Sequence, residues 1–226
     1  MMLTPAESEV LLLSLRVAVF CVALSLPFAV ALGWLLARTD FSGKSILDGL
    51  CHLPLVLPPV VTGYVLLLLF GRRGWLGGWL EDGLGIRLAF DWKGAVLASA
   101  VVGFPLMLRA IRLAIEGVDP RLEGVARTLG AGKLRAFATV TLRLASPGLL
   151  VGALLSFARS LGEFGATITF VSNIQGETRT IPSAIFTYLN QPGGEAAAAR
   201  LVILSVLLSL TAMVASEYLS RRLRKS

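Results

Sequence analysis

DPRLEGVARTLGAGKLRAFATVTLR, residues 119–143, reads as a short amphipathic helix, a glycine hinge and a basic second helix between two long apolar segments. Asp119 and Pro120 predict a helix start, because an aspartate side chain accepts hydrogen bonds from unpaired backbone N–H groups and proline suits the first helical turn. Four apolar side chains then recur at a spacing that places them in one stripe: Leu122, Val125, Ala126 and Leu129.

A glycine hinge follows this stripe. We expect Gly130 to end the first helix and Gly132 to allow a second sharp turn before helical spacing resumes over residues 133–143. The stripe could lie on the membrane surface or on the chain's own spans. A rigid, bent helix pair is also a compact shape for a groove in a separate soluble protein, and the hinge favours that interpretation.

The whole chain is rich in apolar residues. Of its 226 residues, 55% are apolar and 15% are charged, and the mean hydropathy is +0.78, whereas soluble domains average roughly 25% charged residues. This composition predicts a multi-spanning protein surrounded by membrane lipid. The net charge of +7 could indicate nucleic-acid binding, but the basic residues lie in short loops between apolar runs, so no nucleic-acid partner is expected.

Five apolar windows are long enough to cross a bilayer as helices, which takes about 20 residues each. They cover residues 10–37, 53–70, 94–115, 144–171 and 197–216. We therefore predict an all-α membrane protein of about five transmembrane helices, organised as a single transmembrane domain over residues 1–226.

The charges of the loops predict the orientation of these spans. The loops after the first and third spans, together with the C-terminal segment, hold most of the 21 lysines and arginines. Because basic loops are retained in the cytoplasm, we expect the N-terminus outside, the C-terminus inside and a cytoplasmic loop at residues 116–146.

Three prolines crowd the start of the second window. Pro54, Pro58 and Pro59 each remove a backbone donor and kink a helix. Pro58 and Pro59 are therefore candidates for a bent helix that lines a translocation pathway, although a buried structural kink would use the same residues.

Two opposite charges lie in the fourth window. Arg159 and Glu163 are four residues apart, so they can pair on one helix face. An ionised group inside a membrane usually faces protein or a water-filled cavity. The pair could be an internal salt bridge that fixes helix packing, or Arg159 could offer positive potential along an anion route while Glu163 orients it. Thr167 carries a further polar group toward the outer surface.

No motif for nucleotide binding or covalent chemistry is present in the sequence. Gly43, Lys44 and Ser45 resemble the end of a phosphate-binding loop, but Arg38 stands where that loop needs glycine. We expect no catalytic residue, no metal site and no cofactor. If transport is powered by ATP, another polypeptide must hydrolyse it.

Residues 119–143 resemble the cytoplasmic loop of binding-protein-dependent ABC importer permeases. Ala126, Gly130 and Leu142 match the family pattern, whereas its glutamate, its first alanine and its final proline are missing, and Glu123 stands one place early. The resemblance extends to molybdate permeases through four more blocks: HLPLVLPPVVTGYVLLL (52–68), FPLMLRAIRLAIEGVD (104–119), FARSLGEFGATITFVSNI (157–174) and GETRTIPSAIFTYL (176–189).

This resemblance implies a type I importer permease of the bacterial inner membrane. It implies a homodimer, two ABC ATPase subunits, a periplasmic oxyanion-binding protein and an oxyanion substrate, with molybdate favoured over sulfate, thiosulfate or tungstate. It also implies that eight residues contact the ATPase: Leu122, Glu123, Val125, Ala126, Leu129, Gly130, Ala131 and Gly132. The alternative is a self-contained anion channel or secondary transporter.

Overall fold

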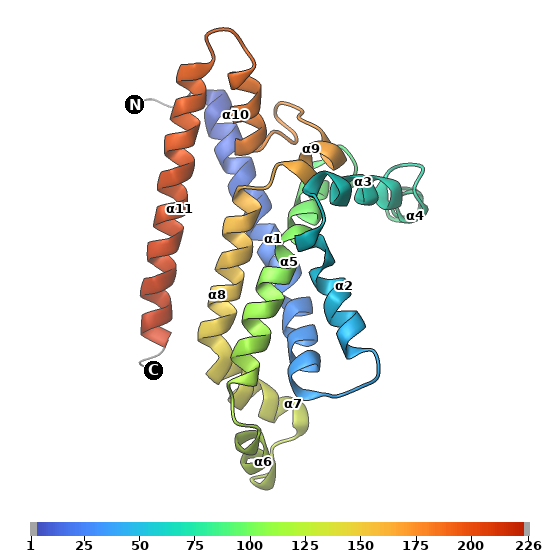
Figure 1. Ribbon diagram of the computed structural model, residues 1–226, viewed down its shortest axis with the longest axis vertical. Coiled ribbons are helices and arrows are strands. Elements are labelled where there is room, and N and C mark those ends of the chain that lie inside the picture. The colour runs from blue at the N-terminus through green and yellow to red at the C-terminus, as the bar shows by residue number, and fades with distance from the viewer. Residues whose placement is uncertain (1–3, 224–226) are drawn as a thin grey trace.

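The computed structural model describes residues 4–223, which form an elongated helical bundle without strands (Figure 1). In chain order the helices are α1 (Pro5–Arg38), α2 (Lys44–Val56), α3 (Pro59–Phe70), α4 (Trp75–Leu84), α5 (Trp92–Glu116), α6 (Pro120–Thr128), α7 (Lys133–Ala136), the π-helix η1 (Phe137–Thr141), α8 (Leu142–Leu161), α9 (Gly165–Val171), α10 (Ile181–Leu189) and α11 (Glu195–Leu223).

Four helical stretches within residues 4–223 are long and apolar enough to cross a membrane: α1, α5, α11 and the continuous run Lys133–Leu161. The bent pair α2 and α3 makes a fifth span if it is counted as one. The prediction of an all-α membrane protein with about five spans is therefore confirmed.

Two of the predicted windows have the wrong limits. The second span begins at Lys44 rather than residue 53, and it bends by 112° between α2 and α3. The fourth window, 144–171, combines the end of one helix with a separate helix, since α8 stops at Leu161 and α9 starts at Gly165. Hydropathy averages apolar character and does not detect where a helix stops, which explains both errors.

Helix α5 forms the centre of the bundle, with α1 and α8 packed along it. Met107, Ile111 and Ile115 of α5 are fully buried. Helix α8 approaches closely at Gly152, where an added Cβ atom would lie 3.0 Å from the carbonyl oxygen of Met107. The backbones of α5 and α8 therefore pack in contact, as small residues allow in membrane proteins.

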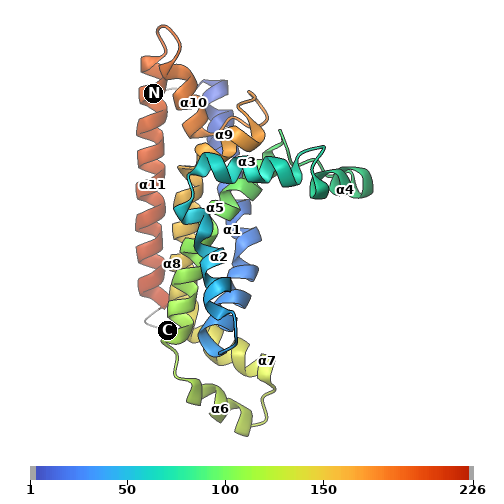
Figure 2. The same cartoon turned by 45° about the vertical axis from the view of Figure 1, so that its right-hand side comes forward.

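A second layer crosses one end of the bundle. Helices α3 and α4 extend sideways from it (Figure 2), and α9 packs against α3. An added Cβ atom at Gly63 would lie 2.5 Å from the carbonyl oxygen of Ala166, and one at Gly165 would lie 2.8 Å from Cβ of Pro59. The two glycines thus allow α3 and α9 to touch.

The two ends of the bundle differ. Helix α10 and the first turns of α1 and α11 gather at one end, whereas α6 and α7 lie at the other (Figure 1). Glu7 of α1 joins Arg200 of α11 through an ion pair of 2.8 Å. Arg224 and Lys225, which entered the prediction of orientation, lie outside the described residues.

Candidate functional site

Helix α6 exposes an apolar stripe at one end of the molecule. The Asp119 carboxylate accepts a hydrogen bond of 2.9 Å from the backbone N–H of Arg121, so the predicted cap is confirmed. The exposed fractions of Leu122, Val125 and Leu129 are 44%, 57% and 83%. Apolar side chains exposed together in this way are typical of an interaction surface.

The hinge after α6 depends on one glycine. Gly130 has a φ of +91°, a left-handed conformation that favours glycine. Gly132 is extended, with φ −66° and ψ 161°, and occupies the N-cap position of α7, a conformation that does not itself need glycine. Ala131 lies between them and donates its backbone N–H to the carbonyl of Ala126 at 3.0 Å.

A further exposed apolar side chain follows the hinge. Leu134 of α7 is 81% exposed, and our sequence interpretation did not include it. It is the second residue of the short helix that begins at Lys133, on the chain's return to the bundle. The apolar surface at this end of the molecule, here called the α6 patch, therefore comprises Leu122, Val125, Ala126, Leu129 and Leu134.

The α6 patch is joined to the bundle through side chains. The Thr141 hydroxyl of η1 donates a hydrogen bond to the Glu123 carboxylate of α6. Arg38, at the end of α1, donates to the carbonyl of Val118 at 2.7 Å, just before α6. Because η1 continues directly into α8, a displacement of α6 would be transmitted to a spanning helix.

Pro58 and Pro59 lie at the bend between α2 and α3. Pro58 is exposed and occupies the N-cap position of α3, and Pro59 is the first residue of that helix. Pro59 packs against Gly165, at the start of α9. The prolines therefore form the break predicted for this window and belong to the contact between α3 and α9.

Arg159 and Glu163 form an ion pair, with 2.8 Å between Nη1 and Oε2. Their location differs from the prediction, because they lie at the end of α8 and in the break before α9 rather than near the middle of one span. The Glu163 side chain is almost fully buried, whereas Arg159 is 28% exposed. Only Arg159 of this pair can therefore reach solvent.

Glu163 also supports the helix that follows it. Its Oε1 accepts a hydrogen bond of 2.8 Å from the backbone N–H of Ala166, in the first turn of α9. Thr167 is buried, and its hydroxyl donates to the carbonyl of Phe164 at 2.9 Å. Both side chains therefore make local contacts that hold the break between α8 and α9.

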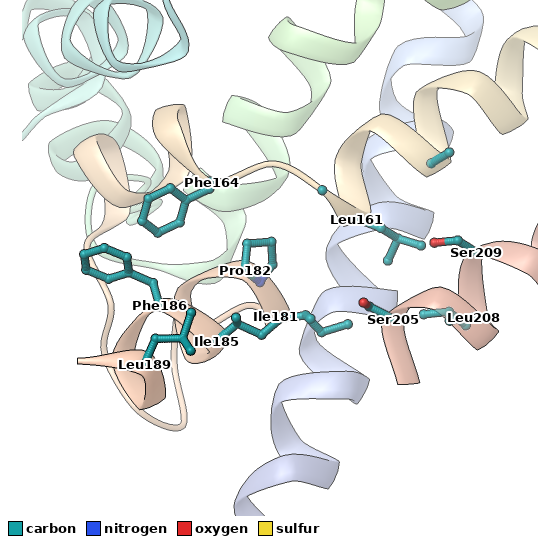
Figure 3. Close-up of a pocket in the computed structure, with 12 residues that line it drawn as sticks. Leu161, Phe164, Ile181, Pro182, Ile185, Phe186, Leu189, Ser205, Leu208 and Ser209 are labelled. Atoms are coloured by element: carbon teal, nitrogen blue, oxygen red, sulfur yellow. The ribbon is translucent and has the colours of Figure 1, made fainter. Parts of the chain in front are cut away.

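A hollow of about 470 Å³ lies between α8, α10 and α11 (Figure 3). Apolar side chains such as Leu161, Ile185 and Leu208 dominate its lining. One of its two serine hydroxyls, that of Ser205, donates to the carbonyl of Val202 at 2.8 Å. Such a surface does not compensate a charged ligand, so this hollow is not an anion site.

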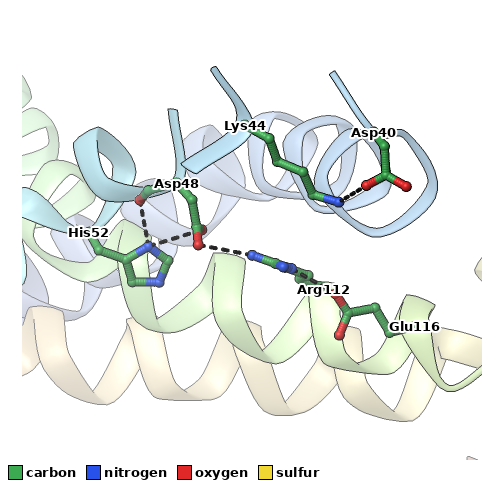
Figure 4. A network of polar contacts seen from close by, with 6 residues as sticks. All are labelled: Asp40, Lys44, Asp48, His52, Arg112 and Glu116. Carbon is green, nitrogen blue, oxygen red and sulfur yellow. Dashed lines mark hydrogen bonds and ion pairs between the residues drawn. The ribbon is translucent and has the colours of Figure 1, made fainter. Parts of the chain in front are cut away.

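A polar network joins α2 to α5 near the α6 end of the bundle (Figure 4). Arg112 contacts Asp48 at 3.1 Å and Glu116 at 2.8 Å. His52 accompanies Asp48 on α2, with its Nδ1 atom 2.8 Å from the Asp48 carbonyl oxygen and 3.4 Å from Oδ1. Our sequence interpretation did not find this network, because its partners come from different helices.

Spanning helices around α5, a broken crossing layer at one end and an exposed bent helix pair at the other define a membrane component of a transport system. The family model for the inner membrane component of binding-protein-dependent transport systems matches residues 29–225, so the chain belongs to this family of multi-pass inner membrane proteins.

One similar relative is the molybdenum transport system permease protein ModB of Escherichia coli K12, which is 60% identical over 98% of this chain and 96% of its own length. The sulfate transport system permease protein CysT of the same organism is 37% identical over 80% of this chain and 66% of its own length.

The crystal structure of a bacterial alginate ABC transporter in complex with an alginate pentasaccharide-bound periplasmic protein contains a similar chain. Its TM-score is 0.77 at 16% identity, over 99% of this chain and 81% of that one. This likeness confirms the predicted importer permease fold.

Proposed function

We propose that this chain is the membrane-spanning subunit of an ATP-driven importer that carries molybdate into the cytoplasm. An identity of 60% to a molybdenum permease over nearly the whole of both chains supports the substrate. The sulfate permease is less similar and matches less of the chain, which favours molybdate over sulfate.

The single observation that carries the mechanism is the exposed α6 patch. It is apolar, it is bent by a left-handed glycine, and the contact between Glu123 and Thr141 ties it to α8. We infer that a groove of a separate ABC ATPase holds this patch. When two ATPase subunits close on ATP, they would displace α6 and, through η1, tilt α8.

The orientation and the partners follow from this assignment. The α6 end would face the cytoplasm, and the opposite end, with α10 and the first turn of α1, would face the periplasm and receive an oxyanion-loaded binding protein. Two copies of this chain would enclose one pathway and present one α6 patch to each of two ATPases. ATP hydrolysis would take place only in those partners.

The pathway would pass the two helix breaks. Pro58 is exposed at the bend between α2 and α3, and Arg159 is the partly exposed member of its ion pair. Arg159 would contribute positive potential for a passing anion. Glu163 and Thr167 would act indirectly, by holding the break between α8 and α9.

The docking mechanism is tested by Gly130→Asp in the complete transporter, reconstituted with its ATPase and binding protein. An aspartate there adds a charge next to Leu129 of the α6 patch and costs roughly 1–2 kcal/mol in the left-handed conformation. We expect ATP-driven molybdate uptake to fall at least about tenfold, together with loss of ATPase co-purification, while membrane insertion is retained.

Gly85→Asp is the matched control, because Gly85 is also left-handed with open space around it but lies after α4. It should leave uptake unchanged. Normal uptake in Gly130→Asp would refute docking at α6. Uptake by the purified chain without any ATPase would favour a channel or secondary transporter, and competition between molybdate, tungstate and sulfate in the same assay would define the substrate.

A further inference from the structure

Arg109 is an exposed arginine within a spanning helix. It lies seven residues before the last residue of α5, which places it about 10 Å inside the α6 end of that helix at 1.5 Å per residue. Among the side chains that the structure describes, its guanidinium has neither an ion-pair partner within 4.0 Å nor a hydrogen-bond acceptor. A charge at such a depth requires water, an anion or a partner nearby.

The face of α5 that carries Arg109 bears a cluster of charges beside the exposed Leu113. Arg112 and Glu116 follow at helical spacings of three and seven residues, so three charged side chains share this face within two turns. Arg112 is compensated, because it contacts both Asp48 and Glu116 (Figure 4). Among the three, Arg109 is the one whose charge none of the described side chains compensates.

Toward the end of the bundle that lies opposite α6, other helices cover the same face of α5. Pro105 and Val102, about one turn and two turns before Arg109, are buried. Val102 belongs to the apolar cluster that also contains Leu66 of α3 and Ala166 of α9. The crossing layer of α3 and α9 thus covers this face of α5, and the face becomes open near Arg109.

We propose that Arg109 is a transient binding residue for a divalent tetrahedral oxyanion, in the part of the pathway between the crossing layer and the α6 end. The proposal rests on the proposed function for the direction of transport and for molybdate as the probe. A guanidinium offers paired N–H donors that suit oxyanion geometry. A single such group binds weakly, as passage requires, because a tight site would retain the anion.

Arg109 differs in this respect from Arg159. The charge of Arg159 is compensated by Glu163 at 2.8 Å, whereas none of the described side chains compensates Arg109. Arg159 can therefore bias an anion only through its residual potential, but Arg109 has its full set of donors free to bind one.

The experiment compares Arg109→Gln, Arg109→Lys and the control Arg73→Gln in proteoliposomes that contain the complete transporter, binding protein and ATP. Arg73 is exposed between α3 and α4, away from α5. We expect Arg109→Gln to lower the molybdate uptake rate about tenfold, the loss of about one good charge-assisted hydrogen bond. Lysine should restore most of the rate, and Arg73→Gln should change nothing.

Water access is measured separately with Arg109→Cys in a Cys51→Ser background, where the remaining Cys21 is buried. An anionic, membrane-impermeant methanethiosulfonate added at the α6 side should label the introduced thiol in the nucleotide-free transporter, and molybdate should slow that labelling. This reaction needs no transport, so it tests the site even if the wild type carries another substrate.

Three results would overturn the proposal. Unchanged uptake in Arg109→Gln, with a wild type that transports molybdate, would remove Arg109 from the route and leave the proposed function standing. Absence of labelling would place Arg109 against lipid. Failure of Arg109→Gln to assemble, corrected by Arg109→Lys, would indicate a structural ion pair with the second copy. A wild type that moves no molybdate would instead refute the proposed function.

Discussion

The two helix breaks of the molecule lie against each other but have different causes. Between α2 and α3 the chain bends by 112° at Pro58 and Pro59. Between α8 and α9 the helix stops at Leu161 without any proline, and Glu163 holds the start of the next helix by accepting from the N–H of Ala166. The first break results from two prolines in the local sequence, whereas the second depends on a buried carboxylate.

This difference shows how a membrane protein tolerates interrupted helices. Prolines remove donors from the backbone, so a proline break leaves fewer N–H groups to satisfy. The break after α8 leaves N–H groups that need an acceptor, and Glu163 supplies one while Arg159 compensates its charge. The crossing layer therefore combines a break at two prolines with a break whose following helix is held by a buried carboxylate.

The largest effect is expected where the two breaks touch. Gly63→Leu should prevent recovery of folded protein, because even the added Cβ atom would lie 2.5 Å from the carbonyl oxygen of Ala166, a backbone atom that cannot move alone. Overpacking of this kind costs about 3 kcal/mol or more. Yield after size-exclusion chromatography measures the effect. The control Gly49→Leu, in open space on α2, should fold normally. Equal yields of the two variants would mean that α3 and α9 are not in contact.

An intermediate effect is expected from Glu163→Gln. The amide oxygen can still accept from Ala166, but Arg159 loses its counter-charge in a partly buried position. Breaking a buried pair costs about 3–5 kcal/mol, and the partial exposure of Arg159 reduces this to about 1–3 kcal/mol. Thermal unfolding should show a lower Tm.

Arg159→Ala separates the two roles of the pair. Slower molybdate uptake at unchanged Tm would support Arg159 as part of the anion route. A lower Tm with normal uptake would assign the pair to packing alone, and the double variant with Glu163→Gln would give the coupling between the two charges.

The smallest effect is expected from Pro59→Ala. Proline and alanine both suit the first turn of a helix, and Pro58 together with the packing of α3 on α9 should keep the bend. The free energy of unfolding should change by less than about 1 kcal/mol. A large loss of stability on denaturant unfolding would show that this single proline holds the bend.

Sequence patterns predicted the elements whose causes lie within a few residues. Asp119 and Pro120 start α6, the apolar spacing defines its stripe, and Gly130 ends it in the left-handed conformation. Caps, helical periodicity and proline breaks act through neighbouring backbone groups, so they can be recognised without a fold. Hydropathy likewise predicted about five spans, because each span must by its own length and apolar composition be able to cross the membrane.

Tertiary structure alone decided where α8 ends and which charged side chains are compensated. The fourth window was predicted as one span, and the stop after Leu161 became visible only with Glu163 in its place. Asp48 compensates Arg112 because α2 packs on α5, and the same packing leaves the charge of Arg109 without a partner among the described residues. Whether a charge is compensated depends on which helices meet, and this is set by packing between residues far apart in the chain.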